Sequence, residues 1–393
     1  MNFDFEIAKK DLLDFLSIEG ITGYEKNIAN LVKRKLIDYG VPSKYIFFDK
    51  ANKKIPYFTQ TGNLIVKLPG KKTGKRKLFV CHLDTVSLCS GALPKIYKDR
   101  IIPKGHTALG ADNRGGVACL VSMLRYLFVN KVDYPPLTIL FTVREESGLW
   151  GARNVTKSDL GHPHFGFNCD GSTPYNIINS AVGAERWSVE IIGKGAHAGV
   201  EPQEGISSSI VASLALSNIY KKGWFGKITK KNKKGTSNIG YYGDKNGQCA
   251  GSSSNQVTSY VKINGESRSM DKNFVSQITK EYEKSFQAAS LKVLDTKKNK
   301  SKIIFKKNID YYPFKLNTNQ DVVKFSQSIS KKIGFKGNIV SVNGGLDANW
   351  LVRKNIPTIT FGNGHYKPHS LDEYLSISEF KDSCLFAIAL AMN

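Results

Sequence analysis

The apolar positions of the first 180 residues alternate between two periodicities, one typical of helices and one typical of buried strands. Helices are predicted where apolar residues recur at helical spacing, over 26–38 and again between 117 and 128. A strand is predicted at 62–68, and strands buried on both faces are predicted by three short apolar runs, at 78–81, 137–143 and 165–169. This succession predicts an α/β fold with a largely parallel sheet between layers of helices.

The pattern changes after Ser180 and returns at Phe314. Between these points we expect strands at 186–192, 256–263 and 302–312, helices at 206–220 and 273–289, and a Lys- and Gly-rich loop at 221–237. Beyond them we expect a helix at 320–333, a strand at 358–361 and a closing helix at 378–391. The sequence therefore predicts a smaller α+β domain, 182–313, inserted between the two parts, 1–181 and 314–393, of a larger domain.

Charged residues stand where the strands of the larger domain end. In chain order they are His82, Asp84, Asp112, Glu145, Glu146, Asp170 and, much later, His369. The carboxyl ends of parallel strands meet at one edge of a sheet, where ligands bind. Any one of these residues alone would be read as an ordinary polar loop residue. So many carboxylates in one crevice would repel each other, and two divalent metal ions would relieve that repulsion.

The spacing suggests roles within this group. His82 and Asp84 face the same side of a strand end, so Asp84 can accept the second imidazole N–H and fix the tautomer of the ring. Asp112 lies in a glycine-rich helix entry, where one carboxylate can bridge two ions. Glu145 and Glu146 are adjacent and therefore diverge, so that one can bind metal while the other acts as a general base.

Composition changes this picture little. The 57 basic and 33 acidic residues give a net charge of +24, but 47 of the basic residues are Lys, dispersed in runs at 71–77, 221–234 and 292–307. This favours a solvated surface over a dedicated polyanion site, because Arg is the better bidentate ligand for phosphate. The six cysteines show no C-x-x-C spacing, no apolar run is long enough for a membrane helix, and the N-terminus does not resemble a signal peptide. We therefore expect reduced thiols and a cytoplasmic protein.

Five segments together resemble the di-zinc exopeptidase family of peptidase T, aminoacylase-1 and the glutamate carboxypeptidases. They are His82-Leu83-Asp84-Thr85-Val86, Gly110-Ala111-Asp112-Asn113-Arg114-Gly115-Gly116, Glu145-Glu146-Ser147-Gly148, Cys169-Asp170-Gly171 and Pro368-His369-Ser370. The resemblance implies one zinc at His82, Asp112 and Asp170, and a second at Asp112, Glu146 and His369. It also implies Glu145 as general base, Asp84 as the partner of His82 and a cis peptide after Asp112. Cobalt or manganese are alternatives to zinc, and His365 is a rival to His369.

The inserted domain also carries motifs of this family. Gly193 to Gly199 resembles the lid segment whose histidine, here His197, stabilises the oxyanion, often from the other subunit of a dimer. The resemblance assigns the substrate carboxylate to Asn255 and Arg268, and it places Gly345 in a loop that lines the substrate cleft. The insertion point after Asp170 favours the branch that resembles peptidase T, and implies a lid that also forms a homodimer.

The function predicted by this resemblance is metal-dependent hydrolysis of amide bonds in short peptides. An exopeptidase of aminopeptidase polarity acting on di- or tripeptides is favoured. A deacylase of N-acyl amino acids or a carboxypeptidase could use the same metal site and the same base. A remoter alternative is an inactive scaffold that binds polyanions through its basic surface. Neither specific nucleic-acid binding nor membrane binding is expected.

Overall fold

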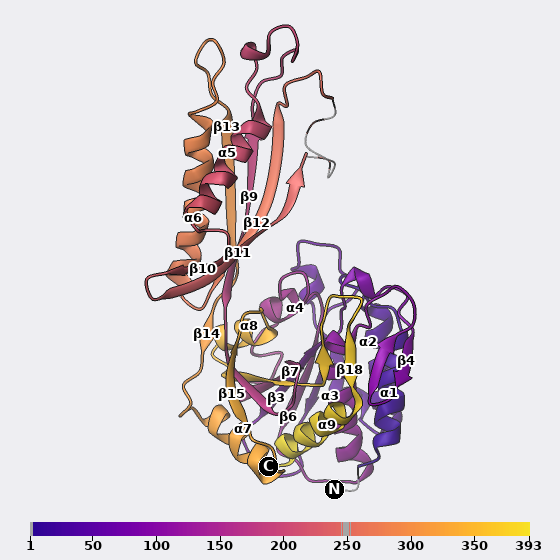
Figure 1. Cartoon of the computed structure of the whole chain (residues 1–393). Coiled ribbons are helices and arrows are strands. Elements are labelled where there is room, and N and C mark those ends of the chain that lie inside the picture. Colours follow the sequence, from indigo (N-terminus) through magenta and orange to yellow (C-terminus); the bar gives the residue numbers. More distant parts are fainter. Residues whose placement is uncertain (1–2, 245, 247–250, 252) are drawn as a thin grey trace. The chain divides into compact units, whose positions relative to one another are not determined.

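The computed structural model describes residues 3–393 except 245, 247–250 and 252. Internal contacts divide the chain into two compact units (Figure 1). Unit 1 comprises Met1–Ala181 and Phe314–Asn393, and unit 2 comprises Val182–Pro313. Each unit has a hydrophobic core of its own, so the two are described separately.

A nine-stranded sheet forms the centre of unit 1, in the order β1-β2-β6-β3-β7-β16-β8-β14, with β15 also paired to β8. Its strands are β1 (Ile46–Phe48), β2 (Leu64–Leu68), β3 (Lys77–His82), β6 (Leu137–Thr142), β7 (Phe165–Gly171), β8 (Asn176–Ala181), β14 (Phe314–Lys315), β15 (Asn338–Val342) and β16 (Thr358–Gly362). The four central strands, β6, β3, β7 and β16, run parallel. Antiparallel pairs, among them β2 with β6, flank this centre. The predicted largely parallel α/β sheet is confirmed for these central strands.

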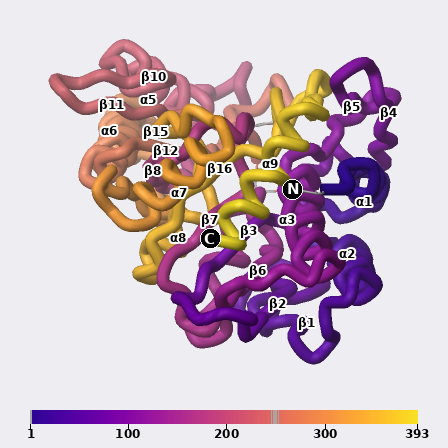
Figure 2. The backbone as a smooth tube through the Cα atoms, turned by 90° about the horizontal axis from the view of Figure 1, so that it is seen from below, coloured from indigo at the N-terminus to yellow at the C-terminus, as the bar shows by residue number. Residues whose placement is uncertain are grey.

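Helices cover both faces of this sheet, because its buried strands point alternate side chains to opposite sides. The helices of unit 1 are α1 (Phe5–Ser17), α2 (Lys26–Asp38), α3 (Ala111–Val129), α4 (Trp150–Asn154), α7 (Asp321–Lys332), α8 (Asp347–Arg353) and α9 (Ile377–Met392). Phe79 and Cys81 of β3 belong to the core that α1, α2, α3, α7 and α9 share, and Figure 2 shows α1, α2 and α3 side by side. Leu78 and Val80 face the other way, into a smaller cluster with Leu351 of α8.

A second, four-stranded sheet lies beside this core in the order β17-β18-β5-β4. Its strands are β4 (Pro94–Tyr97), β5 (Arg100–Pro103), β17 (His365–Tyr366) and β18 (Tyr374–Ser376). The sequence pattern did not predict this sheet, because its strands have two to four residues each and are partly exposed. The turn between β17 and β18 is important for the site, since it holds His369.

Unit 2 is an antiparallel sheet in the order β10-β11-β12-β9-β13 with two helices on one face. The strands are β9 (Gly183–Ile192), β10 (Gly226–Lys230), β11 (Lys233–Gly243), β12 (Tyr260–Ser269) and β13 (Lys302–Tyr311), and the helices are α5 (Ser208–Lys221) and α6 (Lys272–Ser290). The inward side chains of β9, among them Trp187 and Val189, pack against Val211 of α5 and Tyr282 of α6. The α+β character predicted for this segment is observed.

Two expectations for unit 2 were wrong in detail. The stretch 221–237, expected to be a loop, instead forms most of the β10–β11 hairpin, in which Ile228 is buried and Lys227 is exposed. Its many lysines hid the alternating pattern because they occupy the exposed positions of a strand as readily as they occupy a loop. The strand expected at 256–263 is β12, which begins and ends several residues later. None of the helices in the described ranges combines the length and apolar character that crossing a bilayer requires.

Candidate metal centre

The carboxyl edge of the parallel strands brings ionisable side chains together. His82 is the last residue of β3, Asp170 lies at the end of β7, and Glu145 and Glu146 follow β6 in the turn before α4. Asp112 belongs to the first turn of α3, which starts at the same edge. His369 reaches the group from the β17–β18 turn. Five elements distant in sequence thus contribute to one cluster.

Asp112 lies between the two histidines of this cluster. Its Oδ1 is 3.1 Å from Nε2 of His82, and its Oδ2 is 3.8 Å from Nε2 of His369. On the first side, Asp170 Oδ1 lies 3.4 Å from His82 Nε2. On the second side, Glu146 Oε1 lies 2.9 Å from His369 Nε2. One carboxylate oxygen of Asp112 therefore faces His82, and the other faces His369.

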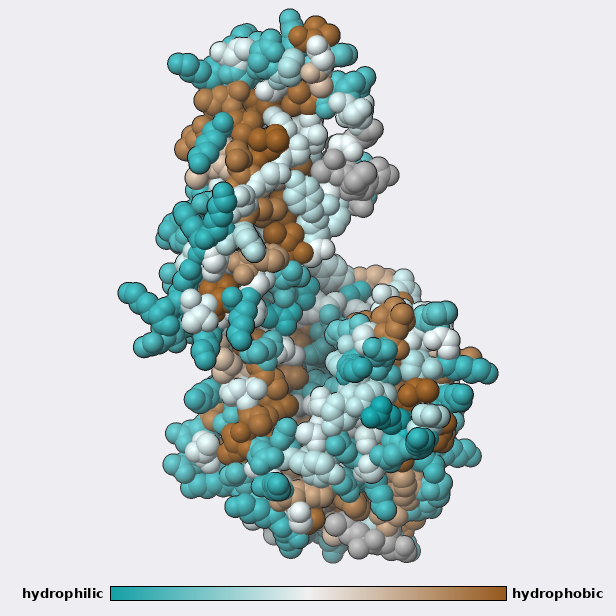
Figure 3. Space-filling model, viewed as in Figure 1, coloured by the Kyte–Doolittle hydropathy of each residue, from teal (hydrophilic) through white to brown (hydrophobic). Residues whose placement is uncertain are grey.

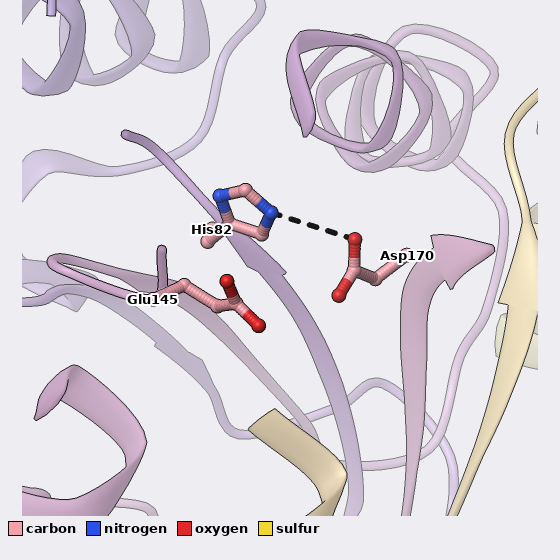
Figure 4. Close-up of side chains that lie close together, drawn as sticks. All are labelled: His82, Glu145 and Asp170. Carbon is pink, nitrogen blue, oxygen red and sulfur yellow. Dashed lines mark ion pairs between the residues drawn. The ribbon is translucent and has the colours of Figure 1, made fainter. Parts of the chain in front are cut away.

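The donor atoms also meet the spatial requirement for metal ligands. Ligand atoms of His82, Glu145 and Asp170 all lie within 4.8 Å of one another, and so do those of His82, Asp112 and Glu146. Figure 4 shows the first group, in which the Glu145 carboxylate points toward the space between His82 and Asp170. Imidazole nitrogens and carboxylate oxygens in this number are the ligands of zinc and related divalent ions.

The ring of His82 is oriented by its neighbour Asp84, but not through the group we expected. Nδ1 lies 3.0 Å from the backbone carbonyl oxygen of Asp84, which accepts its hydrogen, whereas the Asp84 carboxylate is 3.6 Å away. Since Nδ1 donates to this carbonyl, Nε2, the nitrogen that faces Asp112 and Asp170, is the one that would bind a metal ion once its proton is displaced. The tautomer required of a metal ligand is therefore fixed.

The Asp84 carboxylate binds the turn that carries the two glutamates. Its Oδ1 accepts the backbone N–H of Glu145 at 2.9 Å, and its Oδ2 accepts that of Glu146 at 3.2 Å. The hydroxyl of Thr22 donates to Oδ2 at 2.7 Å. Asp84 is completely buried, so these charge-assisted hydrogen bonds place Glu145 and Glu146 relative to His82.

The ionisation of the cluster reflects its concentrated negative charge. Burial raises the pKa of Glu145 well above its usual value, and burial together with the neighbouring Asp112 raises the pKa of Glu146 to about 7. Burial likewise raises the pKa of Asp170. The hydrogen bond to Glu146 raises the pKa of His369 to about 9. Although burial opposes a charged imidazolium, Asp170 and Glu145 raise the pKa of His82 well above its usual value.

These observations test whether a pair of divalent cations fits the site. Four buried or half-buried carboxylates share one cluster, and three of them bind protons more tightly than free carboxylates because their charge is poorly compensated. A divalent cation compensates such charge and displaces the protons. The donor set and its two-sided arrangement around Asp112 fit two ions.

The rival histidine His365 occupies a different position. It is buried, and its Nδ1 lies 3.1 Å from Oδ1 of Asn363. The side chain of Asn363 in turn donates to Asn113, the residue after Asp112. His365 thus contacts Asn363, the partner of Asn113, whereas His369 contacts both Glu146 and Asp112. The geometry favours His369 as the outer ligand, and that assignment remains a prediction.

The residues predicted in the inserted segment lie in unit 2. His197 is exposed, and its backbone pairs with Gln256, next to Asn255. Arg268 lies on β12 beside Ala184, whereas Tyr260, at the other end of β12, pairs with Ile192. Eight residues of strand separate these ends by about 26 Å. One chain therefore does not bring Asn255 and Arg268 together, and the Arg268 guanidinium pairs with Glu266 at 2.9 Å.

Sequence reasoning missed several buried groups around the centre. Glu25 accepts the N–H groups of Gly23 and Arg144, and Glu373 accepts those of Gly110 and Asp112. Asp347 of α8 accepts the hydroxyl of Thr142, the last residue of β6. None of these three acids was predicted to be a site residue, and no sequence pattern marked Glu25 as a partner of Arg144, 119 positions away. Gly345, predicted to line the cleft, lies in the turn before α8.

Comparison with known proteins identifies the family. Residues 78–393 match the family described as peptidase family M20/M25/M40. The chain belongs to this family. It is 28% identical to the uncharacterised protein YqjE of Bacillus subtilis over 97% of this chain and 96% of that protein.

Two solved structures of this fold have the same extent as the chain. The aminopeptidase PepT of Bacillus cereus has a TM-score of 0.81 at 26% identity, covering 99% of this chain and 98% of that one. A tripeptidase of Staphylococcus aureus has a TM-score of 0.86 at 26% identity with the same coverage. The predicted membership among the metallopeptidases of this family is confirmed. The predictions of an enzyme, of metal-dependent exopeptidase activity and of short peptides as substrates are confirmed at the level of the family.

Proposed function

We propose that this M20 peptidase is a di-metal aminopeptidase of di- or tripeptides, and that its active centre is the cluster at the carboxyl edge of the unit 1 sheet. The observation that carries the proposal is the position of Asp112, whose two carboxylate oxygens face two different histidines, His82 and His369. The names of the structural relatives, an aminopeptidase and a tripeptidase, support the polarity and the size of the substrate.

The proposed ligands divide at Asp112. His82, Asp112 and Asp170 would hold one ion, and Asp112, Glu146 and His369 would hold the other. Zinc is the ion we propose, since two imidazoles and three carboxylates suit it well. Bound ions would polarise the scissile carbonyl and increase the acidity of the attacking water.

Glu145 is the proposed general base. Its carboxylate lies with His82 and Asp170, and neither of the two proposed ligand sets includes it. It would take a proton from the attacking water and pass it to the nitrogen of the departing amine. Burial raises the pKa of Glu145, so its carboxylate holds a transferred proton more readily than a free carboxylate does, until the proton passes to the amine.

Unit 2 supplies the proposed substrate contacts. His197 would donate to the developing oxyanion, Asn255 and Arg268 would bind the substrate carboxylate, and Gly345 of unit 1 would line the cleft. Asn255 lies five residues before the start of β12, and Arg268 lies near its other end. If both are to bind one substrate carboxylate, one of them must come from a second chain. The proposed homodimer would meet this requirement.

An apolar surface of unit 2 supports such a homodimer. Ile210 and Leu214, one turn apart on α5, are 52% and 40% exposed. Figure 3 shows hydrophobic side chains gathered over the part of unit 2 that contains α5 and α6. We propose α5 as part of the interface. The five described cysteines are buried free thiols, which agrees with the reducing cytoplasm we propose as the location, and Cys249 lies outside the described residues.

The general base can be tested with Glu145→Gln, which keeps the shape of the side chain and removes its basicity. We expect turnover of a tripeptide to fall by about 100- to 10,000-fold, while the metal content measured by mass spectrometry stays at two ions per chain. Glu6→Gln, an exposed change at the start of α1, serves as the control. Undiminished turnover by Glu145→Gln would refute the assigned role.

Polarity can be tested with a matched set of substrates in zinc, cobalt or manganese. We expect cleavage of tripeptides with a free amino terminus and little cleavage of their N-acetylated forms. Preferential release of N-acyl groups, or cleavage at the carboxyl end, would instead establish the deacylase or the carboxypeptidase alternative. Salt-sensitive retention on DNA without any turnover would support the inactive scaffold.

A further inference from the structure

Glu373 is a buried acid, and each of its carboxylate oxygens accepts a hydrogen bond from a backbone N–H group. It lies just before β18 and is only 1% exposed. Its Oε2 accepts the N–H of Gly110 at 2.8 Å, and its Oε1 accepts the N–H of Asp112 at 3.0 Å. Both oxygens act as acceptors, so the ionised carboxylate suits the geometry. Buried and fully engaged, Glu373 is not free to contact a substrate.

The two N–H groups belong to the irregular start of α3. The helix begins after Gly110, which has a left-handed backbone (φ 77°) and no side chain to cap the helix. Asp112 and Asn113 also depart from helical backbone angles. The Arg114 N–H still donates to the Gly110 carbonyl at 3.2 Å, but the N–H groups at the start of a helix have no acceptor within it. Glu373 supplies the missing acceptor from 261 residues away. The backbone on both sides of Ala111 is thereby fixed to the β17–β18 turn.

The same C-terminal segment holds Asp112 from its other side. The Asn363 amide donates to Oδ1 of Asn113 at 2.8 Å, and that oxygen also accepts the N–H of Gly116 at 3.0 Å. Asn363 and Asn113 are completely buried. Asn363 thus bonds to the residue after Asp112, and Glu373 bonds to the Asp112 backbone. His369, which lies between Asn363 and Glu373 in the sequence, faces Asp112 Oδ2.

We propose that Glu373 is a positioning residue of the metal centre, which holds the Asp112 carboxylate in its two-sided arrangement and at a fixed separation from His369. This inference rests on the proposed function, since it treats Asp112 as the residue shared by two ions. Glu373 acts through its hydrogen bonds to the backbone of Gly110 and Asp112, and it does not contact the substrate or the reacting atoms. If Glu373 only capped α3, its loss would destabilise the helix without changing the affinity of the centre for metal.

The test compares three variants by their affinity for zinc, measured by competition with a chelating dye at a temperature where each metal-free protein is folded. Glu373→Gln keeps one acceptor oxygen and turns an amide N–H toward a backbone N–H, and Glu373→Ala removes both acceptors. Asp372→Asn is the matched control, because it removes the same charge one residue earlier from a side chain that is 78% exposed.

We expect both Glu373 variants to bind zinc at least about tenfold more weakly than the wild-type chain, and Asp372→Asn to remain within about twofold. Thermal unfolding of each metal-free protein confirms folding, and Glu373→Gln retains the test if Glu373→Ala does not fold. Unchanged zinc affinity in Glu373→Gln, with or without a lower melting temperature, would reduce Glu373 to a helix cap and overturn the inference. A wild-type chain that binds no divalent ion would overturn the proposed function, and this inference with it.

Discussion

At the scale of single residues, buried carboxylates that accept backbone N–H groups hold the loops of the proposed centre. Asp84 binds the turn of Glu145 and Glu146, and Glu25 binds the N–H of Arg144 immediately before it. Glu373 binds the start of α3. Hydrogen bonds are directional, and those to an ionised carboxylate such as that of Asp84 are stronger than neutral ones. These loops are therefore held in position by the protein itself.

Glu25 allows a prediction on pH. Burial, reinforced by the nearby Asp84, raises the pKa of Glu25 to about 7, against 4.5 for a free glutamate. The folded state therefore retains a proton that the unfolded chain releases between pH 4.5 and 7, so stability falls as the pH rises through this window. Glu25→Gln removes this effect. It also keeps Oε1, which accepts both N–H groups in the wild-type chain.

We compare the free energy of unfolding of Glu25→Gln with that of the wild-type chain at each pH. We expect the difference to shift in favour of Glu25→Gln by about 2–3 kcal/mol as the pH rises from 4.5 to 8. Urea unfolding of the metal-free proteins at several pH values measures this difference. Asp38→Asn, an exposed change at the end of α2, controls for the loss of one carboxylate. If the difference in free energy of unfolding between Glu25→Gln and the wild-type chain does not vary with pH, the raised pKa of Glu25 is wrong.

At the scale of elements, the central strands were predictable because β3, β6 and β7 are buried on both faces and read as continuous apolar runs. Their carboxyl ends also made the proposed ligands predictable, since consecutive parallel strands must end at one edge. The short strands β4, β5, β17 and β18 carry too few apolar residues to mark them. The contacts of Glu25 and Glu373 could not be predicted, because they join backbone groups through tertiary packing that no local pattern encodes.

The close packing of α3 on β7 gives a prediction for Gly116. A Cβ at this position would lie 2.3 Å from the carbonyl oxygen of Cys169, next to Asp170, and 2.2 Å from Oδ1 of Asn113. We expect Gly116→Ala to destabilise unit 1 by about 1–3 kcal/mol or more, as in other overpacked cores. Calorimetry measures the change, and Gly240→Ala, where nothing lies within 4 Å, is the control. Equal melting temperatures for the two variants would show that α3 is packed less tightly on β7.

At the scale of the whole molecule, the proposed homodimer requires the apolar surface of α5. An aspartate in place of Leu214 would place a charge within that interface, and a buried unpaired charge opposes association. We expect Leu214→Asp to be monomeric in analytical ultracentrifugation under conditions where the wild-type chain is a dimer. Ile37→Asp makes the same change on α2 at an equally exposed position, and should leave the dimer intact. A dimer that tolerates Leu214→Asp would exclude α5 from the interface.

The central claim is that Asp112 is shared between two metal ions, and anomalous diffraction from zinc-loaded crystals at the zinc absorption edge tests it most directly. Two peaks are expected, one beside His82 and Asp170 and the other beside Glu146 and His369, with an oxygen of Asp112 bound to each. A single peak, or peaks away from Asp112, would contradict the account.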